Sequence, residues 1–407
     1  MYLVEKHIVG QSHKYYDECD KLSYLSKNLY NASLYKIRQH YKETKKHLSY
    51  PEVYHKVKTS VDYKALPAKV SCQTIKKLAE NYNSFFKLVK AFNDKKIENF
   101  PSIPKYKKEK YGQLERFLVV YPKQALTLRT FKKEGKIQLS KTNIKLTTKV
   151  SNWNDIKEVR IVPRKKYYIV EVVYFKLEKE LKPDNGNYAS IDVGINNLMT
   201  VAFNNKSIKP LIVNGRPLKS YNQYFNKKLA SFKSELEVKN KVKTSKRISL
   251  LNLKRTNKIN DYLHKVTTEL ANQIELQGVC RVIYGRNKEW KQDVNIGKKN
   301  NQNFVSIPMD KMRSMLEYKL KLRGIEMVEQ EEAYTSKCSF LDLEPIKKHE
   351  KYAGYRKSRG MFKSREKGLI NADLNGAYNI MRKAIPNVYS DGTEGYGVSP
   401  VVLKIKR

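Results

Sequence analysis

The chain has 407 residues, 40% of them hydrophobic, with 82 Lys and Arg against 40 Asp and Glu, which gives a net charge of +42. This length suits two or three domains with ordinary cores. No run of about 18 apolar residues occurs and the first residues lack the layout of a signal peptide, so we expect no membrane span and a cytoplasmic protein. Four scattered cysteines predict neither a disulfide framework nor a paired zinc spacing.

The positive charge runs from one end of the chain to the other and does not form a tail. An AT-rich genome explains many lysines, but it does not explain why acidic residues fail to balance them. A compact fold with this charge repels itself unless a polyanion neutralises it. The composition therefore predicts a large nucleic-acid interface and strongly salt-dependent binding.

Residues 11–112 are predicted to form a helical lobe. Apolar residues recur at spacings of three and four over 22–32 and 75–89, which is typical of helices with one buried face. Pro51 and Pro67 break the stretch between them.

Short β-like runs precede and follow this lobe. We expect a small β-barrel built from residues 1–10 and 113–180, with the helical lobe as an insertion. The runs of the second part cover 116–121, 136–139, 156–162 and 167–174.

Residues 188–407, after a linker at 182–187, are predicted to form an α/β domain. Three strands are followed by a long helical segment and then by strand, helix, strand and helix. This is the order of a ribonuclease-H-like sheet, although actin-like ATPases share it, so the order does not settle the chemistry. The elements cover 189–193, 198–203, 209–213, 219–276, 279–284, 309–323, 325–330 and 372–385.

Two aspartates stand where such a domain would bring them together. Asp192 ends the first predicted strand, and Asp373 falls in the first turn of the last helix, where the helix dipole favours a carboxylate. Gly376 and Ala377 are small enough to let that helix pack closely on the sheet and hold Asp373 over Asp192. Paired carboxylates of this kind are the hard oxygen ligands that magnesium prefers.

Three motifs resemble those of the TnpB family of transposon-encoded, RNA-guided DNA endonucleases, which are related to the compact type V CRISPR effectors. They are Asp192-Val-Gly-Ile-Asn-Asn-Leu, Tyr334-Thr-Ser-Lys-Cys-Ser and Asp373-Leu-Asn-Gly-Ala-Tyr-Asn-Ile. The resemblance implies a split RuvC-type nuclease domain and a wedge-like barrel. It also implies a guide RNA, a double-stranded DNA target and two Mg²⁺ ions, one to activate water and one to stabilise the leaving oxygen.

One departure from the family concerns the second-motif glutamate. Gly285 stands at the end of the middle strand, where that acid is expected. Either the third ligand has moved or the nuclease is inactive. Glu332, then Glu331, are the favoured candidates for a moved ligand, and Glu289 and Asp293 are further ones.

Strand geometry limits this choice. Neighbouring strands lie about 4.8 Å apart, so a ligand one strand further away starts roughly 10 Å from Asp192. A glutamate there reaches the site only if its strand end leans inward, and two solvent-facing acids at 331–332 are the alternative.

A second departure concerns zinc, because relatives carry Cys-x-x-Cys pairs before the last motif. Here Cys338 and His349 are the only cysteine and histidine of the insert 338–370, too few for a four-ligand structural site, so we predict no structural zinc. We expect instead a basic loop that either holds DNA or RNA backbone electrostatically or is partly disordered. Its candidate contacts are Arg356, Lys357, Arg359, Lys363 and Arg365.

Two further segments mix cations with aromatic rings, a combination that suits RNA backbone and base stacking. A solvated lysine face with tyrosines toward the core explains each segment equally well. The candidate contacts are Lys105, Lys107, Lys108, Arg164, Lys165 and Lys166.

Three other functions are open at this point. Gly285 favours a nuclease-dead, RNA-guided DNA-binding repressor, whereas the pair Asp192 and Asp373 argues against it. A DNA transposase would also use acidic residues, but no module that binds transposon ends is evident. An actin-like ATPase would need a second Gly-rich phosphate motif, which the sequence lacks.

Overall fold

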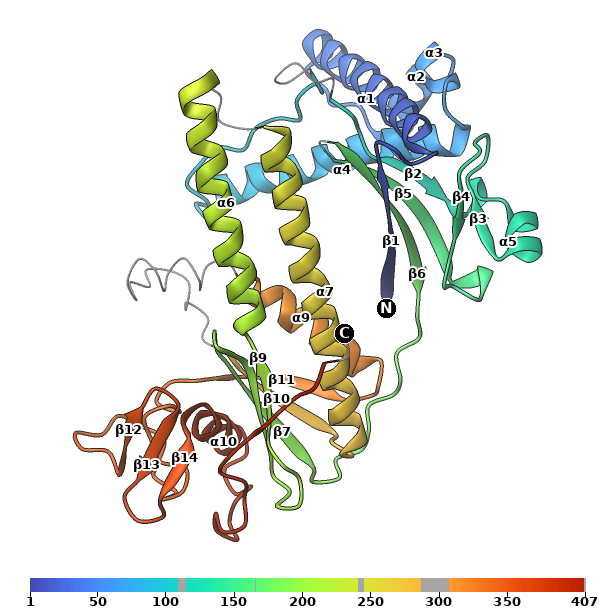
Figure 1. Cartoon of the computed structure of the whole chain (residues 1–407). Helices are drawn as coiled ribbons and strands as arrows, with labels where there is room; N and C mark the ends of the chain where they lie inside the picture. The colour runs from blue at the N-terminus through green and yellow to red at the C-terminus, as the bar shows by residue number, and fades with distance from the viewer. Residues whose placement is uncertain (109–114, 165, 241–244, 287–306, 406–407) are drawn as a thin grey trace. The chain divides into compact units, whose positions relative to one another are not determined.

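The structure is a computed structural model, and it describes residues 1–108, 115–164, 166–240, 245–286 and 307–405 (Figure 1). Two compact units make up the chain, Met1–Leu177 and Glu178–Arg407. The boundary between them lies a few residues before the predicted linker. Among the helices in these ranges, none is both long and apolar enough to cross a membrane.

The first unit contains an antiparallel sheet with the strand order β1-β6-β5-β2. The N-terminal strand therefore pairs with a strand that follows the helices, as an inserted lobe requires. Assignment of these elements to a wedge-like barrel and a helical lobe stays a prediction. The sheet strands are β1 (Tyr2–Gly10), β2 (Val119–Pro122), β5 (Ile156–Arg164) and β6 (Tyr167–Phe175), and a separate pair is formed by β3 (Lys136–Gln138) and β4 (Lys145–Thr147).

The helices of the first unit pack on one core with the inner sides of these strands. Pro51 and Pro67, which the sequence places at breaks, lie at the starts of two helices, where a missing N–H leaves no helical hydrogen bond unmade. The helices are α1 (Tyr16–Thr44), α2 (Tyr50–Val57), α3 (Val61–Lys64), α4 (Ala68–Asn93) and α5 (Leu128–Glu134).

The second unit is built on a six-stranded mixed sheet with the order β11-β10-β7-β8-β9-β15. The pairs β7–β8 and β8–β9 are antiparallel, whereas β10 runs parallel to β7 and β11 parallel to β10. The strands are β7 (Tyr188–Val193), β8 (Asn197–Phe203), β9 (Leu211–Asn214), β10 (Arg281–Arg286), β11 (Glu326–Glu331) and β15 (Val401–Val402).

Strand alternation gives this sheet two different faces. Ala189 and Ile191 belong to the core shared with α7 and α9, whereas Ser190 donates to the backbone of α10. Figure 1 shows α10 on the opposite side of the sheet from α7 and α9. Where the sequence predicts one helical segment over 219–276, the structure has two helices, because Ser245 caps a new one. The helices are α6 (Arg216–Asn240), α7 (Lys246–Leu276), α9 (Met309–Lys321) and α10 (Ala372–Ala384).

The insert 338–370 is more ordered than the sequence suggested. It contains a three-stranded antiparallel sheet whose inner residues Phe362 and Ile370 are buried. The alternative of a partly disordered loop is therefore wrong, because apolar residues among the cations pack into the core that the insert shares with α10 and the sheet. The strands are β12 (Gly354–Ser358), β13 (Met361–Ser364) and β14 (Leu369–Asn371).

A lysine is buried between α7 and α9. Lys319 is 6% exposed, and its Nζ donates to the backbone O of His264 and to the hydroxyls of Thr267 and Thr268 at 2.6–2.7 Å. Three acceptors match the three donors of an ammonium group. Burial, together with the nearby Arg323, nevertheless lowers the pKa of Lys319 to about 8.

This lowered pKa predicts a pH-dependent stability. Between the folded pKa of about 8 and the higher unfolded pKa, the unfolded chain binds more protons at Lys319, so stability rises with pH. We expect the free energy of unfolding of the wild type, relative to Lys319→Met, to increase from pH 7.5 to pH 10. Urea unfolding of both proteins measures this difference, in which the pH effects of the other lysines cancel because both proteins contain them. A difference that is independent of pH would contradict the burial argument.

Candidate functional site

Asp192 lies at the end of β7 on the face of the sheet that α10 covers. A Cβ added at Gly376 of α10 would lie 2.7 Å from Asp192 Oδ2, so only glycine allows the helix to approach this closely. On the same face, Ser190 Oγ donates to the backbone O of Ala377 at 2.6 Å. Helix and strand are therefore fixed to each other at Asp192.

Glu332 directly follows β11, and its side chain reaches across β10. A Cβ added at Gly285 would lie 2.3 Å from Glu332 Oε1. Since Tyr284 of β10 pairs with Ile191 of β7, Gly285 occupies the next register position, beside Asp192. The Glu332 carboxylate therefore fills the space that a side chain at position 285 would take.

The turn after β11 fixes the backbone of Glu332. Thr335 donates to the Glu332 carbonyl twice, from its backbone N at 3.1 Å and from Oγ1 at 2.8 Å. Tyr334 adopts a positive φ of 66°, and Asn379 of α10 donates from Nδ2 to the Thr335 carbonyl at 3.0 Å. The Tyr-Thr-Ser motif thus ties Glu332 to the helix that carries Asp373.

Glu331, the last residue of β11, is engaged by other partners. Its carboxylate forms an ion pair with Lys383 and accepts the backbone N–H of Ala333. The hydrogen bond from Lys383 lowers the pKa of Glu331. Of the two favoured glutamates, only Glu332 turns its carboxylate toward Asp192.

Asp373 sits in the first turn of α10. The side chain of Asn371 caps this helix by accepting the backbone N–H groups of Asp373 and Leu374. The Asp373 carboxylate accepts a hydrogen bond from Asn197 Nδ2 at 2.6 Å and lies 3.4 Å from Arg356 Nη2. Nothing near Asn197 in the sequence indicates this contact, since its partner lies on a distant helix.

Like charges shape the electrostatics of this site. Burial, then the charges of Glu332 and Asp373, raise the pKa of Asp192 well above its ordinary value. Burial, then Glu331, raises the pKa of Glu332 to about 7. Within the described ranges, no cationic side chain forms an ion pair with Asp192 or Glu332. Carboxylates in this state gain stability from a bound cation.

The three carboxylates do not form a finished metal cage. Across the parts of the chain that the structure describes, no three His, Cys, Asp or Glu side chains surround a common point closely enough to hold an ion as they stand. Both Asp373 oxygens have partners in this arrangement, Oδ2 with Asn197 and Oδ1 with Arg356.

The other predicted residues fall into three groups. Glu289, Asp293 and Lys165 lie outside the described residues. In the basic 105–108 segment, Tyr106 packs under Arg38 and Lys107 lies over Tyr30, which leaves only two exposed cations. The exposed predicted contacts are Lys105, Lys108, Arg164, Arg356, Lys357, Arg359, Lys363 and Arg365, while Lys107 and Lys166 are partly buried.

Buried carboxylates hold the insert together. Glu344 is 6% exposed and accepts the backbone N–H groups of Ser339 at 2.7 Å and Ala353 at 2.8 Å. Asp342 accepts the Ser364 hydroxyl at 2.7 Å and the Arg365 N–H at 3.0 Å. These contacts join the two ends of the insert, which is the task of a metal in a zinc ribbon.

The two residues that offer zinc ligands are occupied otherwise. The Cys338 thiol is buried and donates to the Lys347 carbonyl, and His349 Nε2 hydrogen-bonds to the Pro345 carbonyl at 2.7 Å. The donor set around them does not fit a four-ligand zinc site.

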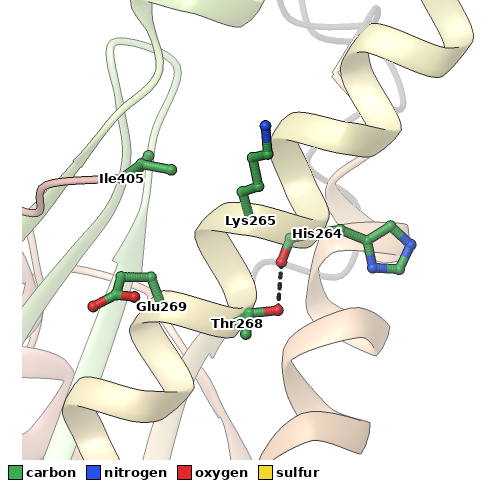
Figure 2. Close-up of a pocket in the computed structure, with 5 residues that line it drawn as sticks. All are labelled: His264, Lys265, Thr268, Glu269 and Ile405. Atoms are coloured by element: carbon green, nitrogen blue, oxygen red, sulfur yellow. Dashed lines mark hydrogen bonds between the residues drawn. The ribbon is translucent and has the colours of Figure 1, made fainter. Parts of the chain in front are cut away.

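A shallow hollow lies elsewhere on this unit. It has a volume of about 280 Å³ and is lined by five residues of α7 and the C-terminal segment, none of them a candidate site residue. Figure 2 shows the Thr268 hydroxyl bonded back to His264 of the same helix turn, and the ends of Lys265 and Glu269 apart. The residues that line it are His264, Lys265, Thr268, Glu269 and Ile405.

The carboxylate contacts of the insert predict a stability effect. In Glu344→Gln, one of the two acceptor oxygens becomes an NH₂ group that faces a backbone N–H, so we expect a loss of about 1–3 kcal/mol in the stability of this unit. Thermal unfolding compared with Glu350→Gln, a change at an exposed acid of the same insert, isolates the effect.

The absence of a structural zinc can be tested separately. In magnesium-free buffer, we expect a chelator to leave the unfolding temperature of the wild type unchanged. Purified protein that carries one zinc ion per chain, and whose unfolding temperature a chelator lowers, would contradict the prediction of no structural zinc.

Two protein families match parts of this chain. The family OrfB_IS605, described as "Probable transposase", matches residues 170–291, and the family "Cas12f1-like, TNB domain" matches residues 310–380. A comparison with curated protein sequences gave no match.

Solved structures give two further likenesses. The cryo-EM structure of the Cas12f1-sgRNA-target DNA complex covers 90% of this chain and 82% of its own chain, at 17% identity and a TM-score of 0.50. The CRISPR-Cas12f ternary complex covers 89% and 80% at 18% identity, but its TM-score of 0.37 is too low to carry an argument. The first likeness shows a shared mixed α/β, multi-sheet fold. The chain therefore resembles the OrfB_IS605 transposase (TnpB) family over residues 170–291 and a Cas12f1-like TNB domain over residues 310–380.

Proposed function

We propose that this protein is an RNA-guided, Mg²⁺-dependent DNA endonuclease whose RuvC-like site uses Glu332 as a relocated ligand. One observation carries the proposal: the Glu332 carboxylate lies in the space left by Gly285, at the register position beside Asp192. The middle strand has lost its acid, and the neighbouring strand end supplies one at the same place.

The topology of the second unit supports this reading. Three antiparallel strands followed by two parallel ones, with the order β11-β10-β7-β8-β9, is the arrangement of a ribonuclease-H-like sheet. In our proposal, the first strand provides Asp192 and the last helix provides Asp373, while Glu332 joins them from beyond β11. The ATPase alternative shares this order but gives no reason for a third carboxylate beside Asp192.

The chemistry of the donors fits magnesium. Asp192, Glu332 and Asp373 offer hard oxygen ligands, and the raised pKa values of the first two show carboxylates that lack a compensating cation. Bound Mg²⁺ would supply Lewis-acid activation and neutralise charge on the cleaved phosphodiester. Asn197 would orient Asp373, and Arg356 would exchange this aspartate for a phosphate of the bound strand.

The partners follow from charge and from the similar structure. A net charge of +42 calls for a long polyanion, and the solved Cas12f1 is in complex with an sgRNA and target DNA. In our proposal, a guide RNA and double-stranded DNA occupy the basic surfaces. The protein recognises the shape of the hybrid, while base pairing supplies the sequence.

The decisive experiment is to purify the protein from cells that carry its native locus and to sequence any RNA that co-purifies. Matching DNA is then added with Mg²⁺. RNA binding with cleavage supports the proposal, and binding without cleavage favours the repressor. The absence of bound RNA would refute both RNA-guided functions.

The geometry separates the two glutamates sharply. We expect Glu332→Gln to lower the cleavage rate at least ~100-fold, because it removes a ligand charge, and Glu331→Gln to stay within about threefold of the wild type. Single-turnover cleavage of matched DNA measures both, with bound RNA as the control for folding. Equal rates for the two variants would contradict the relocation.

Gly285 gives an independent test. A methyl group at this position would meet Glu332 Oε1 at 2.3 Å and Ile380 Cδ1 at 2.6 Å, both of them ends of side chains that can shift. We therefore expect Gly285→Ala to lose most cleavage activity while stability falls by no more than about 2 kcal/mol. Gly10→Ala, where an added Cβ meets nothing within 4 Å, is the matched control. Full activity of Gly285→Ala would mean that the position of Glu332 does not matter.

A further inference from the structure

Helix α4 continues well past the core that it packs on. Its buried residues end at Tyr82, yet the helix runs to Asn93, so its last eleven residues (93 − 82) include none that is buried. This stretch is about 16 Å long at the helical rise. A helix end that serves only as a connector needs no apolar residues here.

The stretch is nevertheless rich in phenylalanine. Phe85, Phe86 and Phe92 lie on it, and the chain that returns from the helix adds Phe100 and Ile103. We call residues 83–103 the aromatic extension. Phe100 meets Phe92 edge-on, with the ring centroids 5.3 Å apart, and lies 6.5 Å from Phe85. Phe85 and Phe86 lie 5.4 Å apart.

Two of these rings, Phe86 and Phe100, are exposed, although Phe86 also meets His47 edge-on at 5.1 Å between ring centroids. Phe86 is 45% exposed and Phe100 is 62% exposed, and Leu88 and Ile103 are exposed to a similar degree. Only Phe85 packs partly against the core of the first unit. A contiguous exposed apolar group of this kind marks an interaction site more often than a solvated surface.

The returning chain is fixed in place, so the rings are preorganised. Asn31 of α1 bonds to residue 107 in both directions, accepting its N–H and donating to its carbonyl at 2.9 Å. Arg38 donates to the Pro104 carbonyl at 2.7 Å. These anchors fix the chain just after Phe100 and Ile103 to helix α1.

The charges around the rings select the partner. Within residues 83–108, six exposed lysines outnumber two acids, Asp94 and Glu98, and Asp94 is paired with Lys96. A second copy of this surface would bring lysines against lysines, whereas a polyanion would be attracted. The exposed lysines are Lys87, Lys90, Lys95, Lys96, Lys105 and Lys108.

We infer that the aromatic extension binds single-stranded nucleic acid, with unpaired bases stacked on Phe86 and Phe100 and phosphates held by the surrounding lysines. Aromatic faces bordered by cations are the usual platform for unpaired bases. The inference extends the proposed function by giving the unpaired bases of its nucleic acid a binding site, but it does not depend on DNA cleavage.

The test is photo-crosslinking of the full-length protein to a mixed-sequence single strand that carries 5-iodouracil, a base that crosslinks to stacked aromatic rings. Peptide mapping should place crosslinks on Phe86 or Phe100. We expect Phe86→Leu with Phe100→Leu to abolish these crosslinks and weaken binding about tenfold, since leucine keeps the apolar contact and removes the ring face. The slope of affinity against salt should stay unchanged, because no lysine is lost.

Tyr2→Leu is the matched control, since Tyr2 is 60% exposed on β1 of the same unit. Crosslinks that map elsewhere, or that survive in the double variant, overturn the inference. So does sedimentation that shows a dimer dissociated by the double variant, which would assign the surface to a second copy. Because the single-stranded probe is added to the purified protein, the crosslinking result does not depend on DNA cleavage. A protein that cleaves no DNA can still support this inference, and one that cleaves DNA can still contradict it.

Discussion

The missing side chain at Gly285 is the constraint on which the site depends. Glu332 starts on the far side of β10 from Asp192, and only an empty position on the intervening strand lets its carboxylate reach the same place. In the proposed site, the glycine in the middle strand and the glutamate after β11 therefore depend on each other. Neither works without the other, because a side chain at 285 and the Glu332 carboxylate would occupy the same volume.

The rest of the unit serves to hold this crowded group of negative charges. Gly376 lets α10 approach Asp192, Ser190 fixes the helix to the strand, and the Thr335 turn fixes Glu332. This packing raises the pKa values of Asp192 and Glu332. Crowding these carboxylates does not stabilise the fold, so it favours a functional role for them. A bound cation, together with a polyanion, would relieve the repulsion between their charges.

The sequence predicted the strands of both units well, because period-two alternation and turn residues are local signals. It did less well where the decisive contact is distant. One helical segment proved to be α6 and α7, and the insert proved to be a small sheet joined by Glu344 and Asp342. The bond between Asn197 and Asp373 could not be predicted, since nothing near Asn197 in the chain reveals it.

The sequence by itself determined the charge, the order of the elements and the two aspartates on the first strand and the last predicted helix of the second unit. It also favoured two adjacent glutamates for the third acid, Glu332 before Glu331. Only the tertiary structure decides where each carboxylate lies. The Glu331 carboxylate pairs with Lys383 of α10, whereas the Glu332 carboxylate enters the space above Gly285. That space exists only once β10 lies between β7 and β11.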